Sequence, residues 1–363
     1  MAARQPYFAD PVANTTPFDV RGKSAIVTGA GSGINFSFAE LLLSRGCNVL
    51  IADLSLRPEA QKLVDEYSGK DGRKARAVFQ KTDVTDWGQL ERMFEVAIQS
   101  FGQVDILCPG AGIYDPHWSN FWHPPGTPSS KDSPSGGRYA SLDINVAHPI
   151  RATQLAIAHF LNPPQGVKKV GKENPKRVII ISSIAGQVSN LHTPIYVAGK
   201  HAMNGFIRSL GHLDSELGIR VNGVAPGIIK TPLWTEHPEK NKFLDSSTDE
   251  WATPEEVAEG MLRCLEEPEL GGGQILEIGA GQTRLVKMLN DPGPSGPGHT
   301  ASKIRDNYTE VFEWLGQDGW GKADGKGKKV NVVQTGFTMN LVSVVAGGLS
   351  VLAGAWLWGK YRR

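Results

Sequence analysis

Cysteine is scarce in this chain, and its pattern excludes two classes of protein. Cys47, Cys108 and Cys264 are odd in number and have no CxxC spacing. The sequence therefore predicts neither a disulfide framework nor a zinc site, and it favours a reducing compartment. His117 and His123 lie close together, but no cluster of carboxylates or cysteines accompanies them, so we expect no bound metal.

An excess of either charge is missing as well. Lys and Arg number 38 against 37 Asp and Glu, for a formal net charge of +1, so nothing indicates a nucleic-acid partner. The 363 residues, 40% of them hydrophobic, are enough for one large domain with appendages. Residues 1–20 lack a basic start followed by an apolar core, so we expect no secretory signal.

Charge disappears near the other end of the chain. No charged residue occurs from Val330 to Gly359, and Lys360 follows. About 20 apolar residues can span a bilayer as a helix, so we expect a C-terminal transmembrane helix at 337–358 in contact with membrane lipid. A buried helix of a soluble oligomer is the alternative. The expected location is a membrane, with the endoplasmic reticulum as a guess, and a catalytic domain on the cytosolic side.

The middle of the chain alternates short apolar runs with stretches of helical spacing. Seven runs are rich in Val, Ile and Leu: SAIVTG, NVLIADL, ARAVFQKTDV, VDILCPGAG, RVIIISS, IRVNGVAPG and GQILEIGAG. Such runs are typical of parallel strands buried on both faces. The helical stretches include TPEEVAEGMLRCLEEP, where Thr253 and Glu256 form a capping box. The alternation predicts an α/β fold with a doubly wound, mostly parallel sheet.

Composition also divides the chain into parts. Residues 113–140 are rich in Pro, Gly and Ser and are interpreted as a long loop inserted in the sheet domain. A second loop, an amphipathic helix and a flexible basic linker are expected later. The expected parts are an N-terminal arm (1–20), the α/β domain (21–285), the loop, helix and linker (286–336) and the apolar helix (337–358).

A glycine-rich turn follows the first expected strand. Gly29, Gly31 and Gly33 let the backbone approach a phosphate closely, at the start of a helix whose N–H groups favour an anion. Asp53 ends the next strand, where a carboxylate can accept hydrogen bonds from ribose hydroxyls and repel a 2′-phosphate. These features favour NAD over NADP, although Arg57 leaves NADP open.

The stretch YVAGK contains Tyr196 and Lys200, which are four residues apart. On a helix these side chains share one face. A nearby ammonium favours the phenolate and lowers the pKa of a tyrosine, so the pair is a candidate proton-transfer device. The alternative is a core tyrosine beside a solvated lysine.

Taken together, these motifs resemble the short-chain dehydrogenase/reductase family, which has a Rossmann-like fold. The resemblance covers roughly residues 22–281. Within the family, the sequence is similar to the branch that contains 15-hydroxyprostaglandin dehydrogenase and its fungal relatives. Asn35 stands where the family has the last glycine of its turn, and Pro109 and Gly110 replace two family asparagines. The resemblance implies cofactor contacts from Thr28, Gly29, Ser32, Gly33, Ile34, Asp53, Asp83, Val84, Ala111, Gly112, Tyr196, Lys200, Pro226, Gly227, Ile229 and Thr231.

The same resemblance implies a catalytic set of four residues. They are Asn145, Ser183, Tyr196 and Lys200, with Ser183 thirteen residues before Tyr196. Tyr196 would exchange a proton with the substrate oxygen, Ser183 would hold that oxygen, and Lys200 would also hold the nicotinamide ribose. Asn145 would bend its helix and hold water in a proton relay.

These features predict an NAD(P)-dependent oxidoreductase acting on a secondary alcohol or ketone. Trp118, Phe121 and Trp122 in the long loop, together with the apolar helix, favour a hydrophobic substrate such as a lipid, polyketide, terpenoid or steroid. A catalytically silent nucleotide-binding scaffold is the alternative. A homo-oligomer is compatible with the sequence but is not specified by it.

Overall fold

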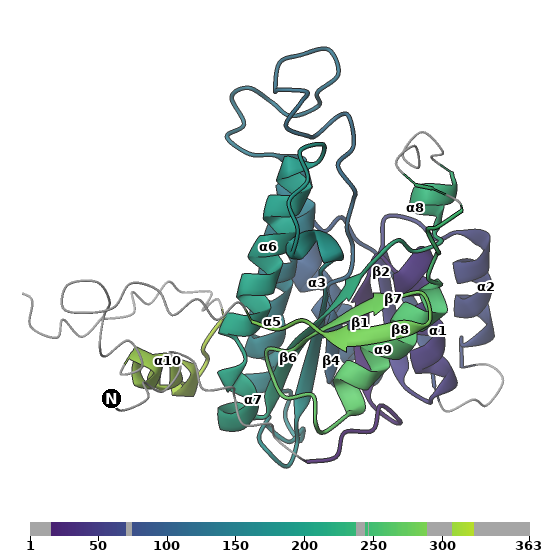
Figure 1. Cartoon of the computed structure of the whole chain (residues 1–363). Coiled ribbons are helices and arrows are strands. Elements are labelled where there is room, and N and C mark those ends of the chain that lie inside the picture. The colour runs from purple at the N-terminus through teal and green to yellow at the C-terminus, as the bar shows by residue number, and fades with distance from the viewer. Residues whose placement is uncertain (1–15, 70–74, 237–243, 246, 289–306, 323–363) are drawn as a thin grey trace, which may run out of the picture. The chain divides into compact units, whose positions relative to one another are not determined.

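A single eight-stranded sheet organises the part of the chain that the structure describes. The structure is a computed structural model and describes residues 16–69, 75–236, 244–245, 247–288 and 307–322. The sheet has the strand order β3-β2-β1-β4-β5-β6-β7-β8 (Figure 1). The strands are β1 (Ser24–Thr28), β2 (Asn48–Asp53), β3 (Ala77–Lys81), β4 (Ile106–Cys108), β5 (Lys176–Ile181), β6 (Ile219–Pro226), β7 (Ile275–Gly279) and β8 (Gln282–Leu285).

The first seven strands are parallel, and the strand order reverses at β1. β1 pairs with β2 on one side and with β4 on the other. From β1 the chain first builds the sheet outward through β2 and β3, and then returns to add β4 and the later strands on the opposite side. Only β8 is antiparallel, against β7. This arrangement confirms the predicted α/β fold with a doubly wound, mostly parallel sheet. A crevice for a ligand is expected where the order reverses, at the carboxyl ends of the strands.

Helices cover both faces of the sheet (Figure 1). Apolar side chains of α1 (Gly33–Ser44), α2 (Pro58–Glu66) and α9 (Pro254–Glu266) form one core with the strands. Those of α3 (Trp87–Phe101), α5 (His148–Leu161) and α6 (Pro194–Ser209) form the other. The capping box of Thr253 and Glu256 is present at the start of α9. Because both faces are buried, the strands between them are continuous apolar runs.

Shorter elements complete the described fold. They are α4 (Ala140–Leu142), the π-helix η1 (Asp143–Ala147), the 3₁₀ helix η2 (Ile184–Gly186), α7 (His212–Leu217), α8 (Pro232–Thr235) and α10 (Asn307–Gly316). Residues 113–139 contain no helix or strand and form the predicted long loop, which projects beyond α6 (Figure 1). The amphipathic helix expected after the sheet corresponds to α10, and Trp320 beyond it packs against the second core.

The predicted transmembrane helix has to be corrected. Among the described residues, no helix is long and apolar enough to cross a membrane. The described α6 has 16 residues, whereas a span needs about 20 apolar ones. The expected segment, 337–358, lies outside the described residues. The membrane location, with its anchor, its lipid contact and its cytosolic catalytic domain, therefore loses its basis and is not retained.

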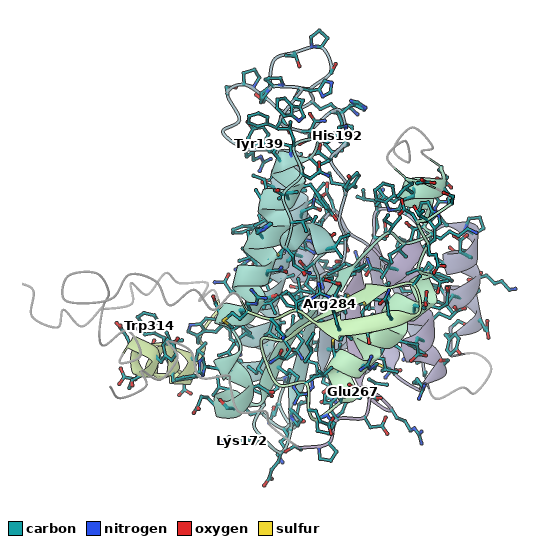
Figure 2. All side chains as sticks on the ribbon, in the orientation of Figure 1. Tyr139, Lys172, His192, Glu267, Arg284 and Trp314 are labelled. Atoms are coloured by element: carbon teal, nitrogen blue, oxygen red, sulfur yellow. The ribbon has the colours of Figure 1, made fainter. Side chains whose placement is uncertain are left out.

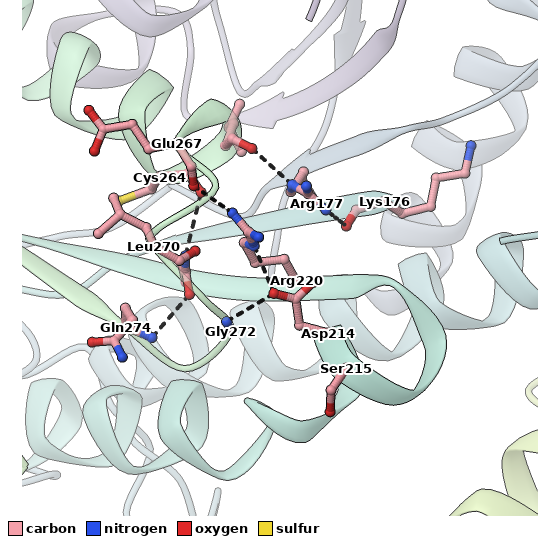
Figure 3. Close-up of polar contacts among 12 residues, drawn as sticks. Lys176, Arg177, Asp214, Ser215, Arg220, Cys264, Glu267, Leu270, Gly272 and Gln274 are labelled. Atoms are coloured by element: carbon pink, nitrogen blue, oxygen red, sulfur yellow. Dashed lines mark hydrogen bonds and ion pairs between the residues drawn. The ribbon is translucent and has the colours of Figure 1, made fainter. Parts of the chain in front are cut away.

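Two buried ion pairs lie at the amino-terminal ends of the central strands. The ammonium of Lys176 is 2.5 Å from the carboxylate of Asp105, and both side chains are almost completely buried. Arg220 pairs with Asp214, which also accepts a hydrogen bond from the N–H of Gly272 (Figure 3). Breaking such a pair from one side leaves a buried charge without a partner, which costs far more than losing an exposed pair.

We therefore predict that Asp105→Ala lowers the free energy of unfolding by about 3–5 kcal/mol, as measured by urea denaturation. The substitution strands the Lys176 ammonium and removes an acceptor for the N–H of Ser24. Lys168→Ala is the control, because its pair with Glu173 is exposed, and we expect a change within about 0.5 kcal/mol. Similar costs for the two variants would contradict the assigned role of Asp105.

Candidate active site

A cleft of about 610 Å³ lies along the carboxyl ends of the parallel strands. Its walls come from the turns after β1, β2, β3, β4, β5 and β6 and from α6. Volumes of this size are typical of sites for cofactors and small ligands. The cleft therefore occupies the position that the reversal of strand order predicts.

The cleft brings together most of the residues that the sequence singles out. Among the expected site residues, Thr28, Gly31 and Asn145 do not line it. The expected residues that line it are Gly29, Ser32, Gly33, Ile34, Asp53, Asp83, Val84, Ala111, Gly112, Ser183, Tyr196, Lys200, Pro226, Gly227, Ile229 and Thr231.

The glycine turn has the conformation that a phosphate site needs. Gly29 and Gly33 have φ angles of 73° and 62°, in the left-handed region that favours glycine. The N–H of Gly31 donates to the carboxylate of Asp53 at 2.8 Å, and a side chain at Gly31 would collide with the carbonyl of Ser55. The start of α1 faces the cleft through Gly33 and Ile34, where free N–H groups favour an anion.

Asn35 and Gly110, two departures from the family pattern, compensate each other. Asn35 is the third residue of α1, so its backbone is helical rather than strained. Its side chain lies between the turns after β1 and β4, 3.0 Å from a Cβ built on Gly29 and 2.2 Å from one built on Gly110. Because the Asn35 amide fills this space, position 110 has no room for a side chain.

Thr28 is buried below the cleft and supports the loop above it. Its hydroxyl accepts a hydrogen bond from the N–H of Ala111 at 3.0 Å and lies 3.2 Å from Nε2 of His148. Nδ1 of His148 donates to the carbonyl of Ile144, so Nε2 accepts from Thr28. Burial lowers the pKa of His148 to about 4, which keeps this link neutral. His148 carries no motif, and the sequence analysis missed it.

Asn145 holds the start of the long loop. It lies in η1, and its side chain accepts from the N–H of Ile113 at 2.9 Å and donates to the carbonyl of Ile113 at 2.8 Å. The π-helical turn widens the helix where the loop meets it, and such turns are frequent at functional sites. Asn145 therefore acts on the cleft through Ile113, which lines it.

Tyr196 and Lys200 lie on one face of α6, with Ser183 beside the tyrosine. Lys200 Nζ is 5.4 Å from the centre of the Tyr196 ring and donates to the carbonyl of Ile181 at 2.9 Å. Ser183 caps η2 by accepting from the N–H of Ala185. The spacing of four residues thus brings the phenol and the ammonium together, as the sequence predicts.

The pKa of Tyr196 differs from the sequence-based expectation. Burial raises it to about 12, and a hydrogen bond with the Ser183 hydroxyl partly opposes the rise. Burial lowers the pKa of Lys200 to about 8. Desolvation therefore outweighs the attraction between phenolate and ammonium that the spacing suggested, and Tyr196 holds its proton at neutral pH.

Asn204 fixes the segment that carries Ser183. Its side chain accepts from the hydroxyl of Ser182 at 2.5 Å and donates to the carbonyl of Gly186 at 2.8 Å. These contacts join α6 to the chain just before η2 and to the last residue of η2. Asn204 lies four residues after Lys200, a helical spacing that could have indicated its position on the same face.

Asp115 links the long loop to the helix of Tyr196. Its carboxylate faces the backbone N–H of Tyr196, near the start of α6, and this contact favours the charged carboxylate. Its φ of 33° is the single positive value for a non-glycine residue in the described chain. Burial raises its pKa to about 6, and His192 and His117 oppose the rise. His192 lies at the loop end of α6 (Figure 2).

Trp118, Phe121 and Trp122, the loop aromatics that the sequence singles out, do not line the cleft. Phe121 and Trp122 are about half exposed, and Lys131 lies over the ring of Trp118. Trp122 donates to the carbonyl of Leu191 at 3.0 Å, which ties the loop to the segment after η2. The cleft instead contains Tyr114, whose ring lies 4.9 Å from that of Tyr196.

Comparison with known proteins agrees with this fold and site. The sequence pattern of the family described as short chain dehydrogenase matches residues 23–242. The 15-hydroxyprostaglandin dehydrogenase [NAD(+)] of Rattus norvegicus is 29% identical over 72% of this chain and 92% of its own length. A hydroxynaphthalene reductase-like protein of Metarhizium guizhouense is 30% identical over 60% of this chain and 73% of its own.

A solved structure is also similar. The short-chain dehydrogenase/reductase "Glucose/ribitol dehydrogenase" from Brucella melitensis superposes with a TM-score of 0.54 at 21% identity, covering 73% of this chain and 98% of that one. The chain belongs to the short-chain dehydrogenase family. The predicted family and the prediction of an oxidoreductase acting on CH–OH groups are confirmed, and the family uses NAD or NADP.

The fit between Asn35 and Gly110 can be tested by a double-mutant cycle. We predict that Gly110→Ala lowers the free energy of unfolding by about 1–3 kcal/mol, because the added methyl meets the Asn35 amide. Asn35→Gly in the same chain opens that space, so the double variant should be more stable than the two single costs predict. Additive costs in urea denaturation would contradict direct compensation.

Asp115 gives a pH-dependent prediction. Its folded pKa of about 6 exceeds the ordinary 3.8, so the folded state binds the proton more tightly and stability is lost as pH rises from about 4 to 6. Asp115→Asn keeps an acceptor, tolerates the positive φ and removes the buried charge. We expect its Tm to exceed wild type by about 2 °C or more at pH 7.5 and to match it near pH 4. An equal difference at both pH values would contradict the assignment.

Proposed function

We propose that this protein transfers a hydride between NAD and an apolar secondary alcohol or ketone. The observation that carries the proposal is one continuous cleft with Asp53 and the glycine turn lining one part and Ser183, Tyr196 and Lys200 lining another. A nucleotide-binding turn and a proton-transfer group in a shared cleft are what such a reaction requires.

The residues of the cleft fit a nicotinamide dinucleotide. The turn at Gly29 and Gly33 leaves room for a pyrophosphate at the start of α1. Asp53 would bind the adenosine ribose, and Asp83 and Val84 would contact the adenine. Lys200 would bind the nicotinamide ribose. The carboxylate of Asp53 favours NAD, because it would repel a 2′-phosphate. When bound, the nicotinamide supplies the hydride in reduction and accepts it in oxidation.

The proton moves at the hydroxyl of Tyr196. In reduction Tyr196 donates its proton to the carbonyl oxygen, and its pKa of about 12 means that the proton is present at neutral pH. In oxidation Tyr196 must first release its own proton to solvent, and the resulting phenolate then takes the proton of the substrate hydroxyl. Ser183 holds the substrate oxygen beside Tyr196, and the ammonium of Lys200, 5.4 Å from the ring, stabilises the phenolate. Asn145 fixes Ile113 in the adjoining wall.

The walls near Tyr196 support an apolar substrate. Tyr114 packs on Tyr196 and on Trp234, with ring centres 4.9 and 4.7 Å apart. Ile184, Val188 and Leu233 are among the other apolar residues that line the cleft. Burial of apolar substrate surface against them contributes about 25 cal/mol per Å². This support comes from Tyr114 and the segment after η2 rather than from Phe121 and Trp122.

Tyr196→Phe provides the test of the proposal. We expect turnover to fall by at least about 100-fold, because the proton donor is lost while the ring remains. The binding of NADH, measured by fluorescence titration, should persist. Turnover is followed by cofactor absorbance with NAD and NADP against hydrophobic secondary alcohols and ketones. Wild-type rates in the variant would contradict the role of Tyr196, and NADH binding without turnover of any substrate would favour the silent scaffold.

A further inference from the structure

An ion pair joins two loops that border the cleft. Arg57, directly before α2, and Glu236, directly after α8, both line the cleft. Nη1 of Arg57 is 2.7 Å from Oε1 of Glu236, and Nη2 is 2.6 Å from Oε2. The two loops follow β2 and β6, which lie on opposite sides of β1 and β4 in the sheet. The pair therefore bridges segments that are 179 residues apart.

Arg57 is the cation that bears on the choice of dinucleotide. Among the described residues that line the cleft, Arg57 and Lys200 are the arginine and lysine side chains. Lys200 is committed to the wall beside Tyr196. Arg57 follows the loop that starts at Asp53, whose carboxylate is held by the N–H groups of Gly31 and Ser55. A free guanidinium here would attract a phosphate on the adenosine ribose.

Glu236 occupies the two guanidinium N–H groups of Arg57 that a phosphate would use. A guanidinium grips carboxylate and phosphate through the same pair of parallel N–H groups. In this structure both of those groups point at one carboxylate, and Glu236 raises the pKa of Arg57 through this hydrogen bond. A 2′-phosphate would have to displace Glu236 and would then lie between two carboxylates, those of Glu236 and Asp53.

We propose that Glu236, by occupying the guanidinium of Arg57, is a specificity-determining residue that favours NAD over NADP. The inference rests on the proposed function, since it concerns the same cleft, and it extends that function to a residue far from Asp53 in the sequence. Asp53 repels the 2′-phosphate directly, whereas Glu236 removes the cation that would compensate for that repulsion.

The size of the effect follows from the exposure of the pair. The side chains of Arg57 and Glu236 are 40% and 53% exposed, so solvent and salt screen their attraction. Pairs of this kind are weak, and the gain in NADP affinity on releasing Arg57 is expected to be about fivefold. The gain should shrink as NaCl is raised, because the new contact between Arg57 and a phosphate is itself electrostatic.

The test compares the dissociation constants of NADPH and NADH for Glu236→Gln, measured by fluorescence titration. We expect the NADPH constant to fall about fivefold and the NADH constant to stay within about twofold of wild type. Adding Arg57→Met to Glu236→Gln should abolish the gain. Glu59→Gln is the matched control, because Glu59 acts on Arg57 through charge without a hydrogen bond, and we expect less than about a twofold change.

The outcomes separate this inference from the proposed function. An unchanged ratio of the NADPH and NADH constants in Glu236→Gln, with NADH still bound, would overturn the role of Glu236 alone. A gain that persists after Arg57→Met would also overturn it. If the wild-type protein bound neither nucleotide, the proposed function itself would fail.

Discussion

The burial of the parallel sheet on both faces is the constraint on which the other features depend. Helices cover the two faces with separate apolar cores, so the middle of each central strand is closed to a ligand. The turns at the carboxyl ends are the part of the sheet left open, and the cleft lies there. The opposite ends of the strands are closed by buried ion pairs such as Lys176 with Asp105. The amino-terminal ends of the strands therefore contribute to stability, whereas the carboxyl ends form the candidate site.

The candidate proton donor is positioned by chain segments that are distant in sequence. Asp115 of the long loop faces the N–H of Tyr196 near the start of α6, and Asn204 fixes the turn that carries Ser183. Asn145 holds the loop itself through Ile113. These bonds of Asn204 and Asn145 are 2.8–2.9 Å long and lie in buried or part-buried surroundings, where leaving a polar group unpaired is costly. The position of the phenol is therefore set by packing more than by α6 alone.

The fold was predictable because its signals are local and repeated. Seven apolar runs separated by helical stretches indicate parallel strands, and all seven occur as strands β1 to β7. β8 was not predicted: its four residues are exposed, so no apolar run marks it. The predicted transmembrane helix is wrong as a part of the described fold, because apolar character alone does not make a segment a spanning helix.

The sequence by itself determined which residue types meet at the cleft, because fixed spacings decide what lies on one face of a helix or at the end of a strand. Tyr196 and Lys200 share a face of α6 for that reason. Only the tertiary structure decided how those groups behave. The pKa of Tyr196 rises to about 12 because other segments bury it, and Arg57 is engaged because Glu236, 179 residues away, lies against it. Burial and long-range pairing depend on how the whole chain packs, and no local pattern encodes them.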